Sequence, residues 1–572
     1  MSIDIETYRL KAQEAIEYVF VKEYHNSLGI PMPIVKMLLP DDANYSTGQY
    51  YITIDKTWQI HLNFGKLPIS YHEFQNEVKV LTRHEIEHYM CCPFDVITHF
   101  RMLKRIRDVY YKHFSHLGIN IEYACGAISN QAADIIVDTK NYYRHSKETL
   151  KSEIDWIKIG ANISACPRHC KLMFLTKEAI WKEDLGINET DPEFLKIVHQ
   201  LADSFTKNGI EDKSSFLDKV EEYAEIFIKL YVEDQKNPQQ SSQQGSQQQS
   251  GQQGPQQQSG QQGSQQQSGQ WGVGRPKDGD EHGNAFVFAD PDKVKEAIEV
   301  LAEETSVEEF IDLLAIAGII GMSDKQKGVL WFNVQSANII PIVEFSNTGN
   351  KSSYTYPSVW RIGDPIEELD LMLTYMTSPR LIPGMTTKKW GYVSNDDNGT
   401  ESKQMDLLLV VDTSGSMGSA MKESANMHQA VLASYGILSY FESTKSKVAF
   451  IGFSDKIDAY VDWSDKYDDV RERLLTNGHG GTKFPISRIK STLDVRSRDL
   501  VTVLITNGDL GNINESVSYF RDYLNDDNKL YIFLLGGSKS LHSYEPLKNI
   551  GAKIYNANNA NEFCDMVLTD ME

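Results

Sequence analysis

The 572-residue sequence has few cysteines and no apolar segment long enough to cross a membrane. Six thinly spread cysteines are typical of a reducing compartment rather than of disulfide-stapled secreted domains. No stretch approaches the ~18 apolar residues of a membrane span, and the amphipathic start, MSIDIETYRLKAQEAIEYVF, is unlike a signal peptide. The net charge of -22 disfavours broad binding to nucleic acid or anionic membrane. We therefore expect a cytoplasmic protein that binds neither.

Between Gln239 and Gln270 the sequence lacks apolar residues and consists almost entirely of Gln, Ser and Gly in a repeating pattern. Such a segment has nothing to bury that would offset the entropy of ordering, so a disordered tether is predicted. A Gln-rich assembly segment is the alternative. The expected organisation is an N-terminal helical domain, a linker, a helical and mixed connecting region and a C-terminal domain: 1–235, 236–284, 285–403 and 404–572.

Helical spacing of apolar residues dominates the segment before the tether. Residues 50–64, rich in β-branched and aromatic side chains, predict two short strands joined at Asp55-Lys56. A long helix is expected from about 71 to 92, where Pro93 stops it. Further helices are predicted near 96–115, 121–146, 170–184, 191–208, 213–233 and 290–324.

From residue 404 the pattern changes to apolar strands that alternate with amphipathic helices. The predicted strands are DLLLVVD, KVAFIGF, LVTVLIT, KLYIFLL and AKIYNA, with helices near 420–442, 465–475, 485–493, 513–524, 543–549 and 559–569. Continuous apolar strands separated by helices indicate a mainly parallel, doubly wound α/β sheet that is covered on both faces.

The first of these strands runs into VVDTSGSMG (410–418). Ligands of open α/β sheets bind at the carboxyl ends of the strands, so Asp412, Ser414 and Ser416 are expected to converge there. A carboxylate, two hydroxyls and water suit a hard octahedral cation such as Mg²⁺. Thr482 in GHGGTKFP and the stretch ITNGDLGN (505–512) lie in loops that could complete the site.

The order DxSxS, GGT, ITxG resembles the von Willebrand factor A (VWA) domain and its metal-ion-dependent adhesion site (MIDAS), over about 404–572. The resemblance implies that a partner's carboxylate takes an open coordination position on Mg²⁺. It also implies that the ion is surrounded, directly or through water, by Asp412, Ser414, Ser416 and Thr482.

One position departs from that family pattern, because Asn507 stands where the family usually has aspartate. An amide oxygen can still hydrogen-bond a coordinated water, but one negative charge is missing. Either the metal affinity is lower or Asp509 compensates. A domain that folds without binding metal is the alternative.

The stretch LTRHEIEHYMCC (81–92) contains HExxH. His84 and His88 are four residues apart, so they share one helix face and can both bind Zn²⁺, while Glu85 could deprotonate a zinc-bound water. A third ligand is expected in SNQAADIIVDTKNYYR (129–144). Asn130, Asp134 and Asp138 share a face there, and acidic groups on an otherwise apolar helix are costly to bury unless paired or metal-bound.

This arrangement resembles the gluzincin-type metallopeptidases, in which an HExxH helix, a preceding edge strand and a later acidic helix build the zinc site. The strand would be WQIHLNF. The resemblance implies Asp134 as ligand and Asp138 as acceptor from a histidine N–H. Asp134 replaces the usual glutamate and is one methylene shorter, so Asn130 or Asp138 are alternative ligands.

Several plainer interpretations stay open. In one of them, the glutamates are only solvated helix residues and the histidines only surface groups. These residues are Glu85, Glu87, His84 and His88. Cys91 lies near the histidine face and is an alternative ligand, although a small buried core cysteine is the commoner case. Cys92 has the same two interpretations. CPRHC, which contains Cys166 and Cys170, looks like half a zinc knuckle without its second half, so a structural role is expected.

The whole chain resembles bacterial proteins that join a metallopeptidase-like helical domain to a VWA domain and act with MoxR-type AAA+ ATPases. The segment 360–390 is similar to the part that precedes the A domain in that class. The resemblance implies a zinc metallopeptidase acting on a protein or peptide substrate, docked through Mg²⁺ on an acidic residue of an ATPase. The alternative is a non-catalytic adaptor or co-chaperone of the ATPase, with a structural or degenerate zinc site.

Overall fold

The structure is a computed structural model. It describes residues 5–236, 291–337 and 405–557, and three two-residue strands, Ser358–Val359 (β4), Leu369–Asp370 (β5) and Lys388–Lys389 (β6). Short gaps fall at 27, 29–31, 39–49, 55–58, 65–69, 118, 161–162, 164–165, 320–321, 497–499, 509, 527 and 536–540. The predicted tether, the 55–56 turn, most of 360–390, Asp509 and the helix at 559–569 lie outside the described residues.

The chain separates into two compact units, each described by itself. The first comprises Met1–Glu304 and Glu309–Gly321, and the second Thr305–Glu308 and Met322–Glu572. The predicted connecting region is therefore divided between them. The protein is multidomain and mostly helical, with one mixed six-stranded sheet. Among the described residues, no helix combines the length and apolar character needed to span a bilayer.

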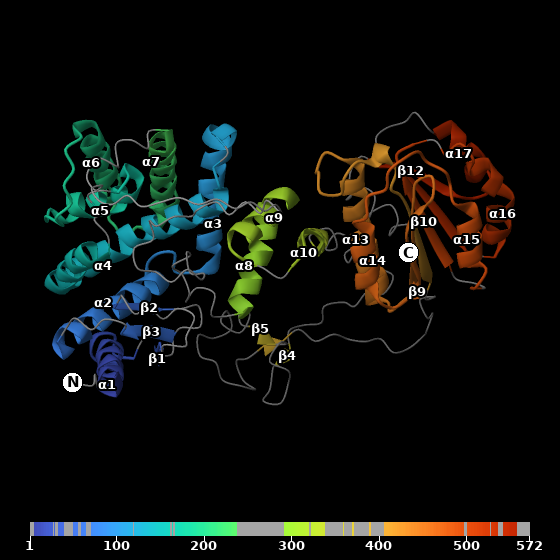
Figure 1. Cartoon of the computed structure of the whole chain (residues 1–572). Helices are drawn as coiled ribbons and strands as arrows, with labels where there is room; N and C mark the ends of the chain where they lie inside the picture. Colours follow the sequence, from blue (N-terminus) through green and yellow to red (C-terminus); the bar gives the residue numbers. More distant parts are fainter. Residues whose placement is uncertain are drawn as a thin grey trace, which may run out of the picture. The chain divides into compact units, whose positions relative to one another are not determined.

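The first unit consists of helices and one small sheet (Figure 1). Strands β2 (Tyr50–Ile54) and β3 (Gln59–Phe64) pair antiparallel, which confirms the two predicted strands. The sequence did not indicate β1 (Ile34–Met37), which pairs parallel with β3. The helices are α1 (Ile5–Glu17) with a π-helical turn (Tyr18–Glu23), α2 (Tyr71–Met90), α3 (Val96–Val109), α4 (Ile121–Gly160), α5 (Arg168–Trp181), α6 (Pro192–Thr206), α7 (Phe216–Lys236), α8 (Pro291–Glu304) and α9 (Val307–Ile316).

Helix α2 carries HExxH and begins at a capping box. Ser70 accepts from the backbone N–H of Glu73, and the Glu73 carboxylate accepts from the backbone N–H of Ser70, so two donors that lack intrahelical partners are satisfied. Phe74, Val78 and Ile86 face α1 in a fully buried cluster. Packing one face of α2 against α1 fixes the direction in which its histidine face points.

Helix α4 is not a single straight rod. The sequence predicted a helix to about residue 146, and the structure continues it to Gly160 with non-helical backbone angles at His145 (φ -135°, ψ 48°). The segment before this break contains Ala132, Ala133, Ile135, Ile136 and Val137, all fully buried. The break changes the direction of the helix, so residues on its two halves can approach one another.

The second unit is built on the six-stranded sheet, in the order β12-β11-β10-β7-β8-β9. The five predicted strands are β7 (Asp406–Asp412), β8 (Val448–Phe453), β10 (Leu500–Thr506), β11 (Lys529–Leu535) and β12 (Lys553–Ala557), and all pair parallel. The sixth, β9 (Ile457–Ser464), is antiparallel to β8 at one edge and was not predicted. The period-two sequence IDAYVDWS would have revealed it.

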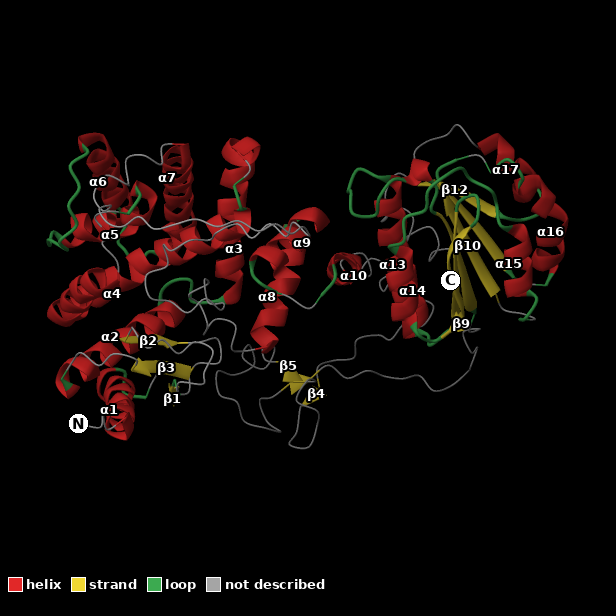
Figure 2. Cartoon of the chain, viewed as in Figure 1, coloured by secondary structure: helices red, strands yellow, loops and turns green. Residues whose placement is uncertain are grey.

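Helices cover both faces of this sheet (Figure 2). One face packs under α15 (Ile486–Leu493), α16 (Val517–Asn525) and α17 (Leu541–Lys548), through a core that includes Leu408, Ile451 and Phe520. The other face carries α13 (Asn426–Ser443) and α14 (Tyr467–Leu474). Helix α10 (Asp324–Ala337) packs on α13, where Trp331 and Phe332 lie against His428.

Candidate metal centres

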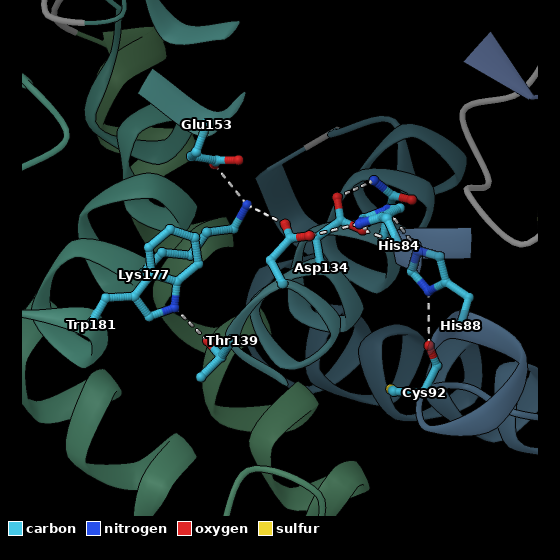
Figure 3. A network of polar contacts seen from close by, with 10 residues as sticks. His84, His88, Cys92, Asp134, Thr139, Glu153, Lys177 and Trp181 are labelled. Atoms are coloured by element: carbon cyan, nitrogen blue, oxygen red, sulfur yellow. Dashed lines mark hydrogen bonds and ion pairs between the residues drawn. The ribbon is translucent and has the colours of Figure 1, made fainter. Parts of the chain in front are cut away.

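Three of the predicted ligands meet between α2 and α4 (Figure 3). The Nε2 atoms of His84 and His88 are 3.0 Å apart, and Asp134 Oδ1 lies 3.6 Å and 3.3 Å from them. His88 and Asp134 are buried, and the His84 side chain is 18% exposed. Among the described residues this is the one group of histidine, cysteine and acidic side chains whose ligand atoms lie close enough to hold a metal ion.

The other ring nitrogens are held by acceptors, which fixes the tautomers. His88 Nδ1 lies 2.8 Å from the carbonyl oxygen of Cys92, and His84 Nδ1 lies 2.7 Å from Asp138 Oδ1. A carbonyl oxygen cannot donate, so His88 carries its proton on Nδ1, and the carboxylate of Asp138 favours the same for His84. Both Nε2 lone pairs then point at the same space as the carboxylate of Asp134.

Three electron-rich atoms this close repel one another unless a positive charge lies between them. Asp134 Oδ1 is buried and accepts no hydrogen bond from the described residues. Burial lowers the pKa of His84, but Asp138, Asp134 and Glu85 outweigh it and raise the pKa to about 9. The cluster therefore attracts positive charge, and a metal ion can take the position that a proton on His84 Nε2 takes in its absence.

Neighbouring side chains orient the third ligand and the first histidine. Asn130 Nδ2 donates to Asp134 Oδ2 at 3.0 Å, which turns the other oxygen of Asp134 toward the histidines. Asp138 Oδ1 lies 2.7 Å from His84 Nδ1, the contact with a histidine N–H that was expected of a residue that orients a ligand. Asp138 is not a member of the cluster, and Asn130 contacts the cluster through Asp134.

Glu85 is buried next to His84, with 8% of the residue exposed. Its carboxylate lies close enough to contribute to the raised pKa of that histidine. Glu87 is fully buried and binds Lys140 and Arg144, each at 2.8 Å. The interpretation of these two glutamates as solvated residues is therefore wrong.

The sequence did not indicate the lysine that binds Asp138 or the backbone carbonyl that binds His88. Lys177 Nζ, on α5, donates to Asp138 Oδ2 at 2.6 Å and to Glu153 Oε1 at 2.9 Å. The carbonyl of Cys92 belongs to the backbone and leaves no side-chain signal. Lys177 could have been noticed as a cation that follows the apolar run LMFLT (172–176), a position that requires acidic partners if buried.

Four of the described cysteines, Cys91, Cys92, Cys125 and Cys166, are buried, and Cys170 is partly buried. Cys91 and Cys92 are fully buried, and burial raises the pKa of Cys91 to about 11 and that of Cys92 well above its usual range. Cys91 is not a member of the cluster. Burial likewise raises the pKa of Cys166, and that of Cys170 to about 12. Between these two, His169 is bound to Asp234 at 2.8 Å.

The second candidate centre lies at the carboxyl edge of the six-stranded sheet. Asp412 ends β7 and is fully buried; its Oδ1 accepts from the backbone N–H of Ser414 at 2.9 Å. Its Oδ2 accepts from the hydroxyl of Thr506 at 2.6 Å, a residue that the sequence did not single out. The hydroxyls of Ser414 and Ser416 are 3.1 Å apart. A carboxylate and two hydroxyls are thus gathered at this edge.

The remaining predicted residues of this centre come from neighbouring loops. Asn507 follows β10; its Oδ1 accepts from the hydroxyl of Ser416 at 3.1 Å and its Nδ2 donates to the backbone carbonyl of Ser416 at 2.8 Å. The carbonyl of Gly480 accepts from the backbone N–H of Gly415 at 3.3 Å, so the glycine-rich loop that carries Thr482 adjoins the loop after β7. Thr482 itself is half-buried.

No protein-family model matches the chain, and no curated protein is significantly similar to it. The interpretation of both centres therefore depends on their geometry and on the sequence motifs that build them.

Proposed function

We propose that the first unit is a zinc-dependent, gluzincin-like metallopeptidase and that the second is a VWA domain with a Mg²⁺ site. The two units together act with a MoxR-type AAA+ ATPase on a protein or peptide substrate. The observation that carries the proposal is the convergence of His84 Nε2, His88 Nε2 and Asp134 Oδ1, with both Nδ1 atoms turned away to acceptors.

The spacing of these three atoms fits zinc. Bonds of ~2.0–2.2 Å in a tetrahedral site put ligand atoms about 3.3 Å apart, and the three separations here are 3.0, 3.3 and 3.6 Å. Two imidazoles and one carboxylate leave the fourth position for water, the pattern of catalytic rather than structural zinc sites. The shorter side chain of Asp134 reaches the cluster, which supports Asp134 over the alternative ligands.

The chain's own residues supply the remaining chemistry. Bound zinc would polarise a peptide carbonyl and acidify a water. Glu85 adjoins His84 and is the candidate base, which would take a proton from the attacking water and return it to the leaving amine. Asp138 and the Cys92 carbonyl hold the imidazole rings in the tautomer that binds metal, and Asn130 holds Asp134.

The strand order supports the Mg²⁺ site. In a doubly wound sheet, ligands bind where the order reverses, outside the carboxyl ends of the strands. Here that point lies between β7 and β10, which end in Asp412 and Thr506. The donors gathered there are oxygens, which Mg²⁺ prefers. An acidic residue of the ATPase would complete the coordination, and ATP-driven motion would act on the first unit.

Zinc content and peptide cleavage test the enzyme. The full chain is purified, its zinc is measured by elemental analysis, and cleavage is assayed with a peptide library. Glu85→Gln is expected to retain zinc and to lose cleavage by at least a hundredfold, because it removes the base and keeps the ligands. Glu122→Gln, a glutamate in the first turn of α4, is the matched control and should leave both unchanged. Zinc-free wild-type protein would contradict the proposal.

The burial of the centre favours a second candidate, the non-catalytic adaptor. His88 is 1% exposed and Asp134 6%, and such enclosure is typical of a structural metal site. An adaptor would bind zinc, cleave no peptide of the library and keep its biological activity in Glu85→Gln. Loss of that activity together with cleavage would exclude the adaptor.

The ATPase contact is tested by a pull-down with a MoxR-type ATPase encoded in the same genome, in Mg²⁺ and in EDTA. Capture is expected only with Mg²⁺ and is lost in Asp412→Ala. Asp526→Ala, an exposed aspartate between α16 and β11 at the opposite edge of the sheet, is the control and should be captured normally. Equal capture in EDTA would exclude docking through the metal.

A further inference from the structure

Lys177 joins parts of the first unit that are far apart along the chain. It lies on α5 and contacts Asp138 in the first half of α4 and Glu153 in the second half. In an uninterrupted helix those two carboxylates would be about 22 Å apart. Both lie within 2.9 Å of one ammonium group, which the break at His145 permits. Lys177 therefore fastens the second half of α4 to the first.

The lysine is fixed as well as paired. Its side chain is 2% exposed, and a buried ammonium is tolerated only when its charge is matched. One turn further along α5, Trp181 donates to the hydroxyl of Thr139 at 3.0 Å and stacks on Tyr142 with ring centres 4.7 Å apart. These contacts hold α5 against α4 next to Asp138, so the position of Lys177 is set by packing. Figure 3 shows the contact of Trp181 with Thr139.

The contacts continue from Lys177 to the metal cluster. One oxygen of Asp138 accepts a hydrogen bond from Lys177, and the other accepts one from His84 Nδ1. The carboxylate therefore cannot rotate without losing one of these hydrogen bonds. His84 in turn directs Nε2 at His88 and Asp134. We propose that Lys177 is a positioning residue of the metal centre, which holds the Asp138 carboxylate in the orientation that aligns His84 for the metal.

This inference depends on the proposed zinc centre and adds a third helix to it. Removing the lysine leaves Asp138 and Glu153 as two close carboxylates without a cation between them. Their repulsion turns Asp138 away from His84, and the ring loses the partner that fixes its direction. Changes to residues that orient a ligand typically cost 10- to 100-fold in metal affinity.

The test measures Zn²⁺ affinity of the full chain by competition with a chromophoric chelator, and the visible spectrum of the Co²⁺-loaded protein. Lys177→Met is expected to bind Zn²⁺ 10- to 100-fold more weakly and to change the Co²⁺ spectrum. Lys177→Arg, which keeps the charge, should restore at least part of the affinity. If Lys177→Met does not fold, Lys177→Gln replaces it and should show the same direction of change.

Lys171→Met is the matched control, because Lys171 is also a buried lysine on α5 but its acidic partner is Glu189, at 2.9 Å, and not Asp138. It should lower the melting temperature and leave Zn²⁺ affinity within about twofold of wild type. A merely structural role for Lys177 predicts the same behaviour for both variants, and that result overturns the inference.

A double-mutant cycle with Asp138→Ala identifies the route. If Lys177 acts through Asp138, then Lys177→Met has little further effect on Zn²⁺ affinity once Asp138 is removed. Additive losses in the cycle would contradict that route. If wild-type protein binds no Zn²⁺ in a manner that depends on His84 and Asp134, the proposed function fails. If it does, and Lys177→Met matches Lys171→Met, only the inference fails.

Discussion

The two ring nitrogens of each cluster histidine have different partners. The Nδ1 atoms of His84 and His88 face a carboxylate and a carbonyl, which accept hydrogen bonds, and the Nε2 atoms face each other. Exchanging the acceptors for donors would move the ring proton to Nε2 and block the metal. The residue types in HExxH permit a metal site, and the acceptors around them decide that both Nε2 atoms are available to it.

Asn507 offers a residue-scale test of the second centre. Its amide donates to the Ser416 carbonyl, which an aspartate cannot do, but an aspartate would add a negative charge beside the candidate ligand Ser416. The added Coulomb attraction outweighs one exposed hydrogen bond, so Asn507→Asp is expected to raise Mg²⁺ affinity about tenfold. Calorimetric titration measures this. Asn525→Asp, exposed at the end of α16, is the control, and unchanged affinity in Asn507→Asp would argue against Mg²⁺ binding beside Ser416.

Glu77 on α2 predicts a pH dependence of stability. Burial raises its pKa to about 7, with Asp155 and Glu73 adding to the rise and Lys151 opposing it. The folded state thus binds this proton more tightly than the unfolded state. The stabilisation is complete below the ordinary value near 4.5 and is lost as the pH rises through 7.

Glu77→Gln imitates the protonated form, so it should match wild type at pH 5 and be more stable at pH 8. The expected gain in free energy of unfolding is about 1–2 kcal/mol, reduced from the full shift because the group is partly exposed. Urea unfolding at both pH values measures it. Glu14→Gln on α1 is the control: Glu14 is exposed and its pKa is lowered, so the variant should gain nothing at pH 8.

The elements of the first unit differ in how far local sequence specifies them. Helix α2 begins where Ser70 and Glu73 form a capping box, a signal that is readable from the sequence. Its end, near Pro93, was also predicted. The predicted helix 121–146 ended one residue beyond the break of α4 at His145. No proline or glycine lies beside the break, and the sequence did not indicate that a second helical segment continues to Gly160. At that point the direction of the second half of α4 depends on the contacts that Lys177 makes with both halves.

Ser70→Ala tests the start of α2. Loss of the side-chain acceptor leaves the backbone N–H of Glu73 without its cap, and the expected cost is about 1 kcal/mol in the free energy of unfolding. Ser70→Asp keeps an acceptor at the same position and should stay close to wild type. Chemical denaturation compares the three proteins. Equal stability of Ser70→Ala and wild type would mean that tertiary packing alone fixes the start of this helix.

The two-unit organisation makes a prediction about the whole molecule. The cluster lies in the first unit and the Asp412 centre in the second, so each metal should stabilise its own unit. Removing zinc with a chelator is expected to lower the melting temperature of one calorimetric transition. The loss is about 4 kcal/mol if free zinc had exceeded its dissociation constant a thousandfold.

Asp134→Asn provides the control for zinc removal, because a variant without the third ligand should already melt at the lower temperature and respond little to the chelator. The second transition should respond to Mg²⁺ and not to zinc removal. A single transition that shifts equally with both metals would contradict independent units. A first transition that the chelator leaves unchanged would contradict zinc binding in the native protein.

Much of the molecule follows from its amino-acid sequence alone. Helical spacing decides that His84 and His88 share one face of α2, and that Asp134 and Asp138 share one face of α4. Five apolar runs decide the parallel strands, and the residues after β7 decide that a carboxylate and two hydroxyls lie at the sheet edge. These features depend on residues a few positions apart, whose relative places are fixed by the helix or strand itself.

Only the tertiary structure decided which faces meet. Asp134 lies opposite the histidines because α1 buries the other face of α2 and leaves the polar face for α4. Asp138 is matched by a lysine from a third helix, and Glu87 by cations from α4. Buried charges select partners by distance in space, and helical periodicity carries no information about residues on separate helices. The sequence therefore specified the ligands, and packing specified how they are held.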